Sequence, residues 1–194
     1  MNFLAHLFLS DADPELIVGN LLGDFVKGRL SGHFPAAIEQ GIILHRLIDS
    51  FTGRNRYFLQ SKRLLDKSFG HYRGVLVDLF YDHFLAVNWD KYADVPLQLF
   101  LTRARQIVQE YEDILPERLR NIFPVIFAEL LPSYLDVKGI DLALQRMSIR
   151  IARPNRLGEG GVELLRHYDR LYEDFQEFLP EIQEYVRERK KMMP

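Results

Sequence analysis

The chain has 194 residues, with 25 lysines and arginines, 27 acidic residues and no cysteine. This length predicts one domain covering residues 1–194. The lack of cysteine excludes disulfides, thiolate metal sites and a cysteine nucleophile, and it fits the reducing cytosol, so we expect a cytoplasmic protein. The formal net charge of −2 and the absence of a long apolar run argue against a general nucleic-acid binder and against a membrane span.

Apolar residues recur mostly at spacings of three and four, and the alternation typical of strands is scarce. This pattern predicts an all-α fold, a single-domain helical bundle. Pro124 and Pro132 are expected to divide their stretch into short or kinked helices, and Pro180 to kink or split the last helix. In chain order, the expected helices cover residues 16 to about 28, 35–53, 56–69, 74–87, 96–114, 116–134, 139–152 and 162–191.

Histidines and aspartates lie inside apolar helical segments, where an ionised carboxylate must be paired, hydrogen-bonded or bound to a metal. In VDLFYDHFLA, Asp78 and Asp82 are one helical turn apart, and like charges at that spacing repel unless a cation lies near. His45 and Asp49 form a second pair four residues apart. The full set is His6, Asp24, His45, Asp49, Asp78, Asp82 and His83.

Each of these residues alone has an ordinary structural explanation, such as a histidine that hydrogen-bonds a backbone carbonyl. Together, oxygen and nitrogen donors without thiolates predict a divalent metal site that suits Mn²⁺, Mg²⁺ or Fe²⁺ better than structural zinc. Bundle cores commonly house such sites. Phosphate-binding loops, the GxSxG motif and the HExxH motif are absent from the sequence.

Charge is unevenly distributed along the chain. Residues 53–73 carry six basic side chains against Asp66 alone, and residues 138–156 carry five against Asp141 alone. Residues 163–184, in contrast, hold seven acids and two arginines. A solvated helix face is the simple interpretation of either basic stretch, but two of them in a slightly acidic chain indicate an anionic partner or substrate.

Four segments, NFLAHLFL, GNLLGDFVKG, GIILHRLIDSFT and VDLFYDHFLAVNW, resemble in order and separation the acyl carrier protein phosphodiesterase family, distant relatives of the HD-domain metal phosphohydrolases. The resemblance implies a mostly helical, HD-like fold. It also implies hydrolysis of the phosphodiester that joins 4′-phosphopantetheine to a serine of holo acyl carrier protein, with Mn²⁺ as the favoured metal and Mg²⁺ or Fe²⁺ as possible substitutes.

The family's buried acids and histidines correspond here to the seven residues named above. We expect Asp24, His45, Asp78 and Asp82 to hold the metal, and Asp49 to orient His45. His6 or His83 would be a further ligand or a proton donor. Two departures from the family pattern are the DH order at 82–83, which reverses the HD dipeptide, and Gly53, which stands where the resemblance implies an aspartate.

Acyl carrier proteins are small and acidic, so the resemblance also gives the basic stretches a role in docking the substrate. A rival hypothesis is an HD-type phosphohydrolase that acts on a small phosphodiester or a nucleotide. A rival of another class is a non-catalytic helical module that binds an acidic partner. The candidate docking residues are Arg54, Arg56, Lys62, Arg63, Arg150, Arg153 and Arg156.

Overall fold

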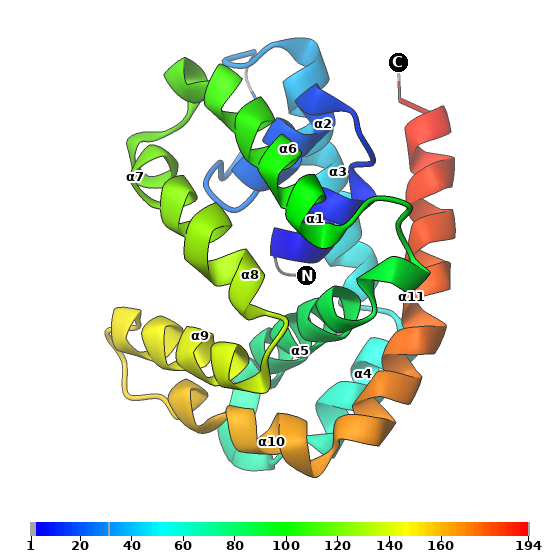
Figure 1. Ribbon diagram of the computed structural model, residues 1–194, viewed down its shortest axis with the longest axis vertical. Coiled ribbons are helices and arrows are strands. Elements are labelled where there is room, and N and C mark those ends of the chain that lie inside the picture. The colour runs from blue at the N-terminus through cyan, green and yellow to red at the C-terminus, as the bar shows by residue number, and fades with distance from the viewer. Residues whose placement is uncertain (1–2, 31, 194) are drawn as a thin grey trace.

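The computed structural model describes residues 3–30 and 32–193, so residues 1, 2, 31 and 194 of the predicted domain lie outside the described part. Within the described part every regular element is helical, which confirms the all-α prediction (Figure 1). The α-helices are α1 (Phe3–Leu9), α2 (Pro14–Leu22), α3 (Ala36–Thr52), α4 (Arg56–Leu64), α5 (Arg73–Val87), α6 (Leu97–Glu110), α7 (Glu117–Val125), α8 (Leu131–Ser133), α9 (Val137–Arg150), α10 (Gly161–Arg166) and α11 (Tyr168–Lys191). The 3-10 helices are η1 (Lys67–Tyr72), η2 (Trp89–Lys91), η3 (Glu112–Ile114) and η5 (Leu157–Glu159), and η4 (Ile126–Leu130) is a π-helix.

Helix α5 lies at the centre of the bundle, where it contacts α1, α4, α9 and α11 (Figure 1). It buries residues on every side, including Phe80 and Phe84, because its sequence is apolar all round. One cluster of buried apolar side chains extends from α1 to α11, as expected of a single-domain bundle. The expected central helix over 74–87 is therefore confirmed.

Helices α2 and α3 approach each other closely because both carry a glycine at their crossing. A Cβ atom at Gly19 would lie 2.6 Å from Gly41 Cα and 2.2 Å from the Ile38 carbonyl oxygen. Only glycine at both positions lets the two backbones meet at this distance. The crossing sets the backbone of Asn20 on α2 against the side chain of His45 on α3, which is the basis of the site described below.

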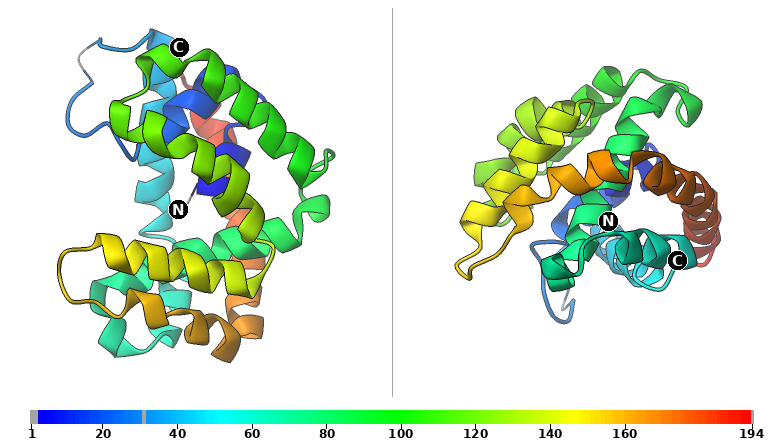
Figure 2. Two further views of the ribbon diagram at one scale, coloured as in Figure 1. Left: turned by 60° about the vertical axis from the view of Figure 1, so that its left-hand side comes forward. Right: turned by 90° about the horizontal axis from the view of Figure 1, so that it is seen from below.

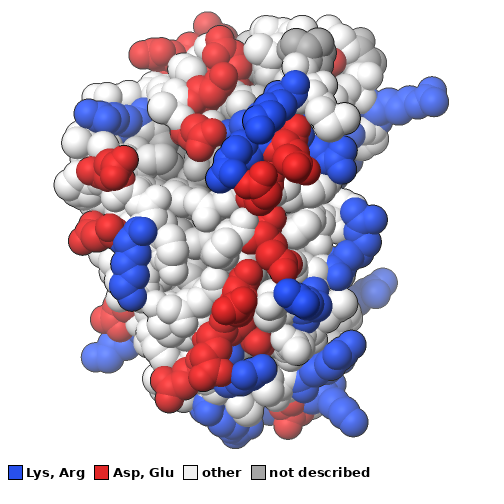
Figure 3. Space-filling view, turned by 90° about the vertical axis from the view of Figure 1, so that its right-hand side faces the viewer, with Lys and Arg blue, Asp and Glu red and all other residues white. Residues whose placement is uncertain are grey.

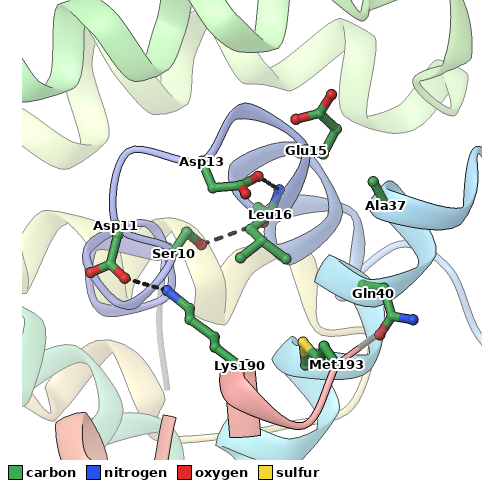
Figure 4. Close-up of a pocket in the computed structure, with 9 residues that line it drawn as sticks. All are labelled: Ser10, Asp11, Asp13, Glu15, Leu16, Ala37, Gln40, Lys190 and Met193. Atoms are coloured by element: carbon green, nitrogen blue, oxygen red, sulfur yellow. Dashed lines mark hydrogen bonds and ion pairs between the residues drawn. The ribbon is translucent and has the colours of Figure 1, made fainter. Parts of the chain in front are cut away.

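Helix α11 runs along one side of the molecule and packs against α3, α4 and α5 (Figures 1 and 2). Its C-terminal end reaches the turn between α1 and α2, where Lys190 Nζ lies 2.7 Å from an Asp11 carboxylate oxygen (Figure 4). A hollow of about 350 Å³ lies beside this ion pair. None of the seven predicted site residues lines this hollow.

Several expected helices end early or divide at other residues. The first expected helix ends at Leu22, so Asp24 and Phe25 lie in the following turn rather than on the helix face that the sequence indicated. The helix expected over 56–69 ends at Leu64, because Asp66 accepts a hydrogen bond from Ser68 N at 2.7 Å and starts η1.

Of the kink or split expected at Pro180, the split is wrong, because α11 continues through this residue. Proline removes one backbone donor, but Gln176, whose carbonyl would accept from residue 180, is exposed and can be satisfied by water. The break occurs instead at His167, between α10 and α11. In the stretch 116–134 the expected interruption is confirmed, with α7, η4 and α8 in succession.

The longest helices in the described part are amphipathic and charged rather than continuously apolar. None of them combines the length and the apolar character that a membrane crossing requires.

Candidate metal centre

Two buried imidazoles stack face to face between α1 and α3. The ring centroids of His6 and His45 are 4.0 Å apart, and the rings are inclined by 15°. Asp49, one turn after His45, places one carboxylate oxygen 3.2 Å from His6 Nε2 and the other 3.2 Å from His45 Nε2. Asp24, in the turn after α2, lies 3.7 Å from His45 Nε2. We call these four residues the His–Asp cluster.

Asn20 fixes which nitrogen of each ring carries a proton. Its side-chain nitrogen donates to the His6 carbonyl oxygen at 3.1 Å and to Ser10 Oγ at 2.9 Å, so its Oδ1 is the atom that faces His6 Nδ1 at 2.8 Å. The Asn20 carbonyl oxygen faces His45 Nδ1, also at 2.8 Å. Both Asn20 oxygens can only accept, so both Nδ1 atoms must donate.

A neutral ring with a proton on Nδ1 has a lone pair on Nε2, and both Nε2 atoms point at the Asp49 carboxylate. Burial lowers the pKa of His6 to about 4, so this ring is neutral near pH 7. Burial raises the pKa of Asp49, but the neighbouring His45 and His6 bring that pKa far below its ordinary value, so the carboxylate is ionised. Lone pairs that face a carboxylate at hydrogen-bonding distance call for a cation between them.

The donor set fits a divalent metal ion. His6, His45 and Asp49 offer donor atoms that all lie within 4.8 Å of one another. Two atoms that bind one ion at about 2.1 Å can be at most about 4.2 Å apart, so the contacts of 3.2 Å and 3.7 Å are within range. The Asp24 and Asp49 side chains are 44% and 45% exposed, whereas both histidines are buried. A bound ion would therefore be held by the interior on one side and be open to a substrate on the other.

Gly23 leaves the space that the His45 ring fills. A Cβ atom at this position would lie 2.1 Å from His45 Cγ and 2.4 Å from Cδ2. The glycine also ends α2, with ordinary right-handed backbone angles, so the requirement is one of space and not of conformation. Gly23 and Asn20 were not among the site residues predicted from the sequence. The signal for Asn20 was present, since an amide in the apolar segment LIVGNLLG needs partners when it is buried.

Asp82 does not join the His–Asp cluster, contrary to its predicted role as a metal ligand. Its carboxylate is fully buried and accepts hydrogen bonds from the backbone nitrogens of Leu4 at 2.9 Å and Ala5 at 3.0 Å. These are free donors in the first turn of α1, and a carboxylate placed there satisfies them. Burial raises the pKa of Asp82 to about 7, although the two backbone bonds oppose this shift. Asp82 thus anchors the helix that carries His6.

His83 is also engaged elsewhere. Its Nδ1 lies 2.8 Å from the Tyr134 carbonyl oxygen and its Nε2 lies 3.1 Å from the Tyr168 hydroxyl, so both ring nitrogens have partners outside the cluster. Burial lowers its pKa, which keeps the ring neutral. His83 connects α5 to the segment after α8 and to the start of α11, and these contacts do not support its predicted role as a ligand or a proton donor.

Asp78 lies one turn before Asp82 on α5. Neither Asp78 nor Asp24 belongs to the group of donors that meet within 4.8 Å, but Asp24 reaches within 3.7 Å of His45 Nε2. Burial raises the pKa of the Asp78 carboxyl, and the negative charge of Asp49 raises it further, while Lys62 lowers it. Gly53, at the end of α3, could accept a side chain, because an added Cβ would meet only the Asp49 carbonyl oxygen, at 3.4 Å.

The predicted basic surface is partly neutralised by α11. The face that carries this helix shows a band of acidic side chains beside basic ones (Figure 3). Arg56 forms an ion pair with Glu181 at 3.0 Å, and Arg156 is held by Glu159 at 2.6 Å. Arg54 bonds to Ser50 through its backbone oxygen and its hydroxyl. The remaining candidates make no ion pair with any described residue: Lys62, Arg63, Arg150 and Arg153.

A family profile and individual relatives both match this chain over nearly its whole length, and they name the same family. The profile of the family described as acyl carrier protein phosphodiesterase matches residues 1–182. The acyl carrier protein phosphodiesterase of Photorhabdus laumondii is 30% identical over 186 residues, which cover 95% of this chain and 94% of the relative. The enzyme of the same name from Klebsiella pneumoniae is 34% identical over 185 residues, 94% of this chain and 95% of the relative. No solved structure matches. These matches over nearly the whole chain place it in the acyl carrier protein phosphodiesterase family.

Proposed function

We propose that the protein is a metal-dependent phosphodiesterase that cleaves 4′-phosphopantetheine from the serine of holo acyl carrier protein. Family membership supports the reaction class and the carrier-protein substrate, since the relatives are named for that activity. One structural observation supports the metal: the Nε2 atoms of His6 and His45 both face the Asp49 carboxylate at 3.2 Å. Mn²⁺ is the proposed ion, with Mg²⁺ or Fe²⁺ as substitutes.

In the proposed mechanism, His6, His45 and Asp49 hold the ion, and Asp24 supplies a fourth donor. When bound, a divalent ion neutralises charge on the phosphate oxygens and lowers the pKa of a coordinated water. Asn20 keeps both rings in the tautomer that has a free Nε2. The water oxygen forms a bond to phosphorus and gives up a proton, while the bond from phosphorus to the serine oxygen breaks and that oxygen takes up a proton. The products are apo carrier protein and 4′-phosphopantetheine.

The exposed carboxylates explain how a protein-bound phosphodiester can reach the site. Asp24 and Asp49 are each almost half exposed, so an ion held by these residues would be accessible from the surface. A serine on a carrier protein can approach such a site without unfolding. The same openness admits a small phosphodiester, so the substrate must be decided by assay.

The decisive experiment incubates holo acyl carrier protein with the full chain and Mn²⁺ and measures the mass of the carrier. We expect loss of the 4′-phosphopantetheine mass, inhibition by EDTA and recovery when Mn²⁺ is added back. His45→Ala should abolish the release, whereas His33→Ala, which changes an exposed histidine outside the cluster, should not. Cleavage of small phosphodiesters or nucleotides with an unchanged carrier would favour the HD-type small-substrate enzyme. No metal-dependent cleavage of either would leave a binding module.

A further inference from the structure

A groove of about 420 Å³ adjoins the His–Asp cluster, with which it shares one residue, Asp24. Phe25 follows Asp24 along one wall, and Val75 on α5 lines another. The opposite side is formed by α7, η4 and α9, which contribute apolar side chains such as Ile126 and Met147. Most of the residues that line the groove are thus apolar, and the lining includes the Asp24 carboxylate, which lies 3.7 Å from His45 Nε2.

Three arginines also line this groove and give it a positive character. Arg118 lies over the Phe25 ring, 5.9 Å from its centroid. Arg146 is 3.4 Å from a Glu129 carboxylate oxygen. The Arg150 guanidinium is exposed and makes no ion pair or hydrogen bond with a described residue. Charged donors around apolar walls suit a ligand that is anionic at one end and amphipathic along its length.

The wall formed by η4 has an unusual backbone. Pro124 near the end of α7 has no N–H, and the chain continues as a π-helix over Ile126–Leu130 before α8 begins. Segments with this wider hydrogen-bonding pattern are rare and occur frequently at functional sites. Here the segment turns Ile126 and Leu130 toward the groove.

The size of the groove favours a small molecule over a protein surface as its occupant. A cavity of a few hundred Å³ matches a small-molecule site, whereas a protein–protein contact needs about 800 Å² on each partner. The larger apolar pocket beside Trp89, of about 580 Å³, and the hollow beside Lys190 contain no residue of the His–Asp cluster. The groove at Asp24 connects a ligand-sized, mainly apolar surface to the proposed metal site.

We propose that this groove binds the pantetheine arm of the carrier's prosthetic group while its phosphate lies at the His–Asp cluster. This inference rests on the proposed function. The dimethyl and methylene segments of the arm pack against the apolar walls, and the arginines donate hydrogen bonds to its amide oxygens. The carrier protein itself stays outside. The groove thereby selects phosphodiesters that carry a long amphipathic arm over compact ones.

Binding can be tested without turnover, because three of the four methionines lie at the chain ends and only Met147 lines the groove. We would label the methionine methyl groups with ¹³C and add 4′-phosphopantetheine in the presence of Mg²⁺. The Met147 signal, assigned with Met147→Leu, should shift with this ligand and stay in place with inorganic phosphate. No shift, or an equal shift with phosphate, overturns the proposal even if the enzyme cleaves holo carrier protein.

A matched pair of variants tests the groove during turnover. Val125 lines the groove and is 42% exposed, while Leu99 on α6 is 41% exposed and lies outside it. Val125→Trp should lower kcat/KM for holo carrier protein about tenfold or more, with Mn²⁺ binding unchanged, and Leu99→Trp should not. Equal activity of the two variants would overturn the groove assignment. If wild-type protein releases no 4′-phosphopantetheine, the proposed function fails, and the Met147 shift still decides whether the arm binds.

Discussion

Asn20 controls which nitrogen of each imidazole is available to a metal. Its side chain and its backbone each hold one Nδ1 atom at 2.8 Å, and its amide is itself held by the His6 carbonyl oxygen and Ser10. Replacing residues that orient metal-binding histidines in this way typically lowers metal affinity about 10- to 100-fold.

Replacing Asn20 should therefore weaken the metal site while leaving the fold intact. Asn20→Leu removes the acceptor for His6, and we expect Mn²⁺ affinity to fall about 10- to 100-fold in a titration followed by electron paramagnetic resonance. Asn20→Asp keeps an acceptor oxygen for His6, so its Mn²⁺ affinity should fall less than that of Asn20→Leu. The control is Asn121→Ala, which changes an exposed asparagine. Equal affinity in Asn20→Leu and wild type, with matching circular dichroism, would remove Asn20 from the site.

For individual residues, the sequence predicted which histidines and aspartates form the site better than it predicted the role of each one. His6, Asp24, His45 and Asp49 were all candidates, and the structure brings them together. Asp49 lies between the two imidazoles rather than behind one of them. Asp82 satisfied the same sequence criterion, a carboxylate in an apolar helix, but it caps α1. Sequence cannot separate these cases, because a helix N-terminus from elsewhere in the chain satisfies a buried carboxylate as well as a cation does.

At the scale of elements, the end of α2 must accommodate the His45 ring. Gly23 and Gly53 are matched for a test, since each follows a helix and each has right-handed backbone angles. Gly23→Ala places a methyl group 2.1 Å from His45 Cγ, so the ring must move and Mn²⁺ affinity should fall about tenfold or more. The methyl group of Gly53→Ala has room in the structure, so this variant should bind Mn²⁺ with the affinity of wild type. Isothermal titration of both variants would check this, and equal affinities would contradict it.

The docking of α1 on Asp82 should depend on pH. The pKa of Asp82 is raised to about 7 in the folded protein, so the folded state holds its proton more tightly than the unfolded state does. Its contribution to stability is complete below the unfolded pKa and is lost as pH rises through about 7. Between about pH 5.5 and 8.5, the unfolding free energy of wild type relative to Asp82→Asn should fall by about 2 kcal/mol.

Urea unfolding of both proteins at the two pH values measures that difference. Subtracting the unfolding free energy of the variant removes the contributions of the other titrating groups. One of these is His6, whose lowered pKa makes stability rise with pH, opposite to the effect of Asp82. A difference that is constant with pH would show that Asp82 keeps its charge throughout this range.

Helix boundaries show where local sequence signals are sufficient. The helix over 35–53 was predicted well because Pro35 and Gly53 mark its ends. The close crossing of α2 and α3 could not be predicted from Gly19 and Gly41, which read as isolated weak points within helices. Only the folded structure shows that these two glycines let the backbones of α2 and α3 pack closely. The site depends on this crossing, and its geometry was therefore beyond the reach of local patterns.

At the scale of the whole molecule, charge that is separated in sequence is partly brought together in space. The acidic residues of α11 lie beside α4, so Arg56 is paired with Glu181 and contributes little field to solvent (Figure 3). Arg63 and Arg153 have no such partner among the described residues. Counting charges along the chain therefore overestimated the basic surface, and the unpaired arginines are the better candidates for steering an acidic carrier.

Charge reversal should separate these two groups of arginines. The double change Arg63→Glu and Arg153→Glu takes one unpaired arginine from each basic stretch and should raise KM for holo carrier protein severalfold at low salt, with kcat little changed. The matched control reverses Arg170 and Arg187, which are paired with acids on α11. At about 1 M salt, where charges are screened within about 3 Å, the first double variant and wild type should converge. A KM that does not change at low salt would mean that these arginines are only solvated and that the carrier is guided by other contacts.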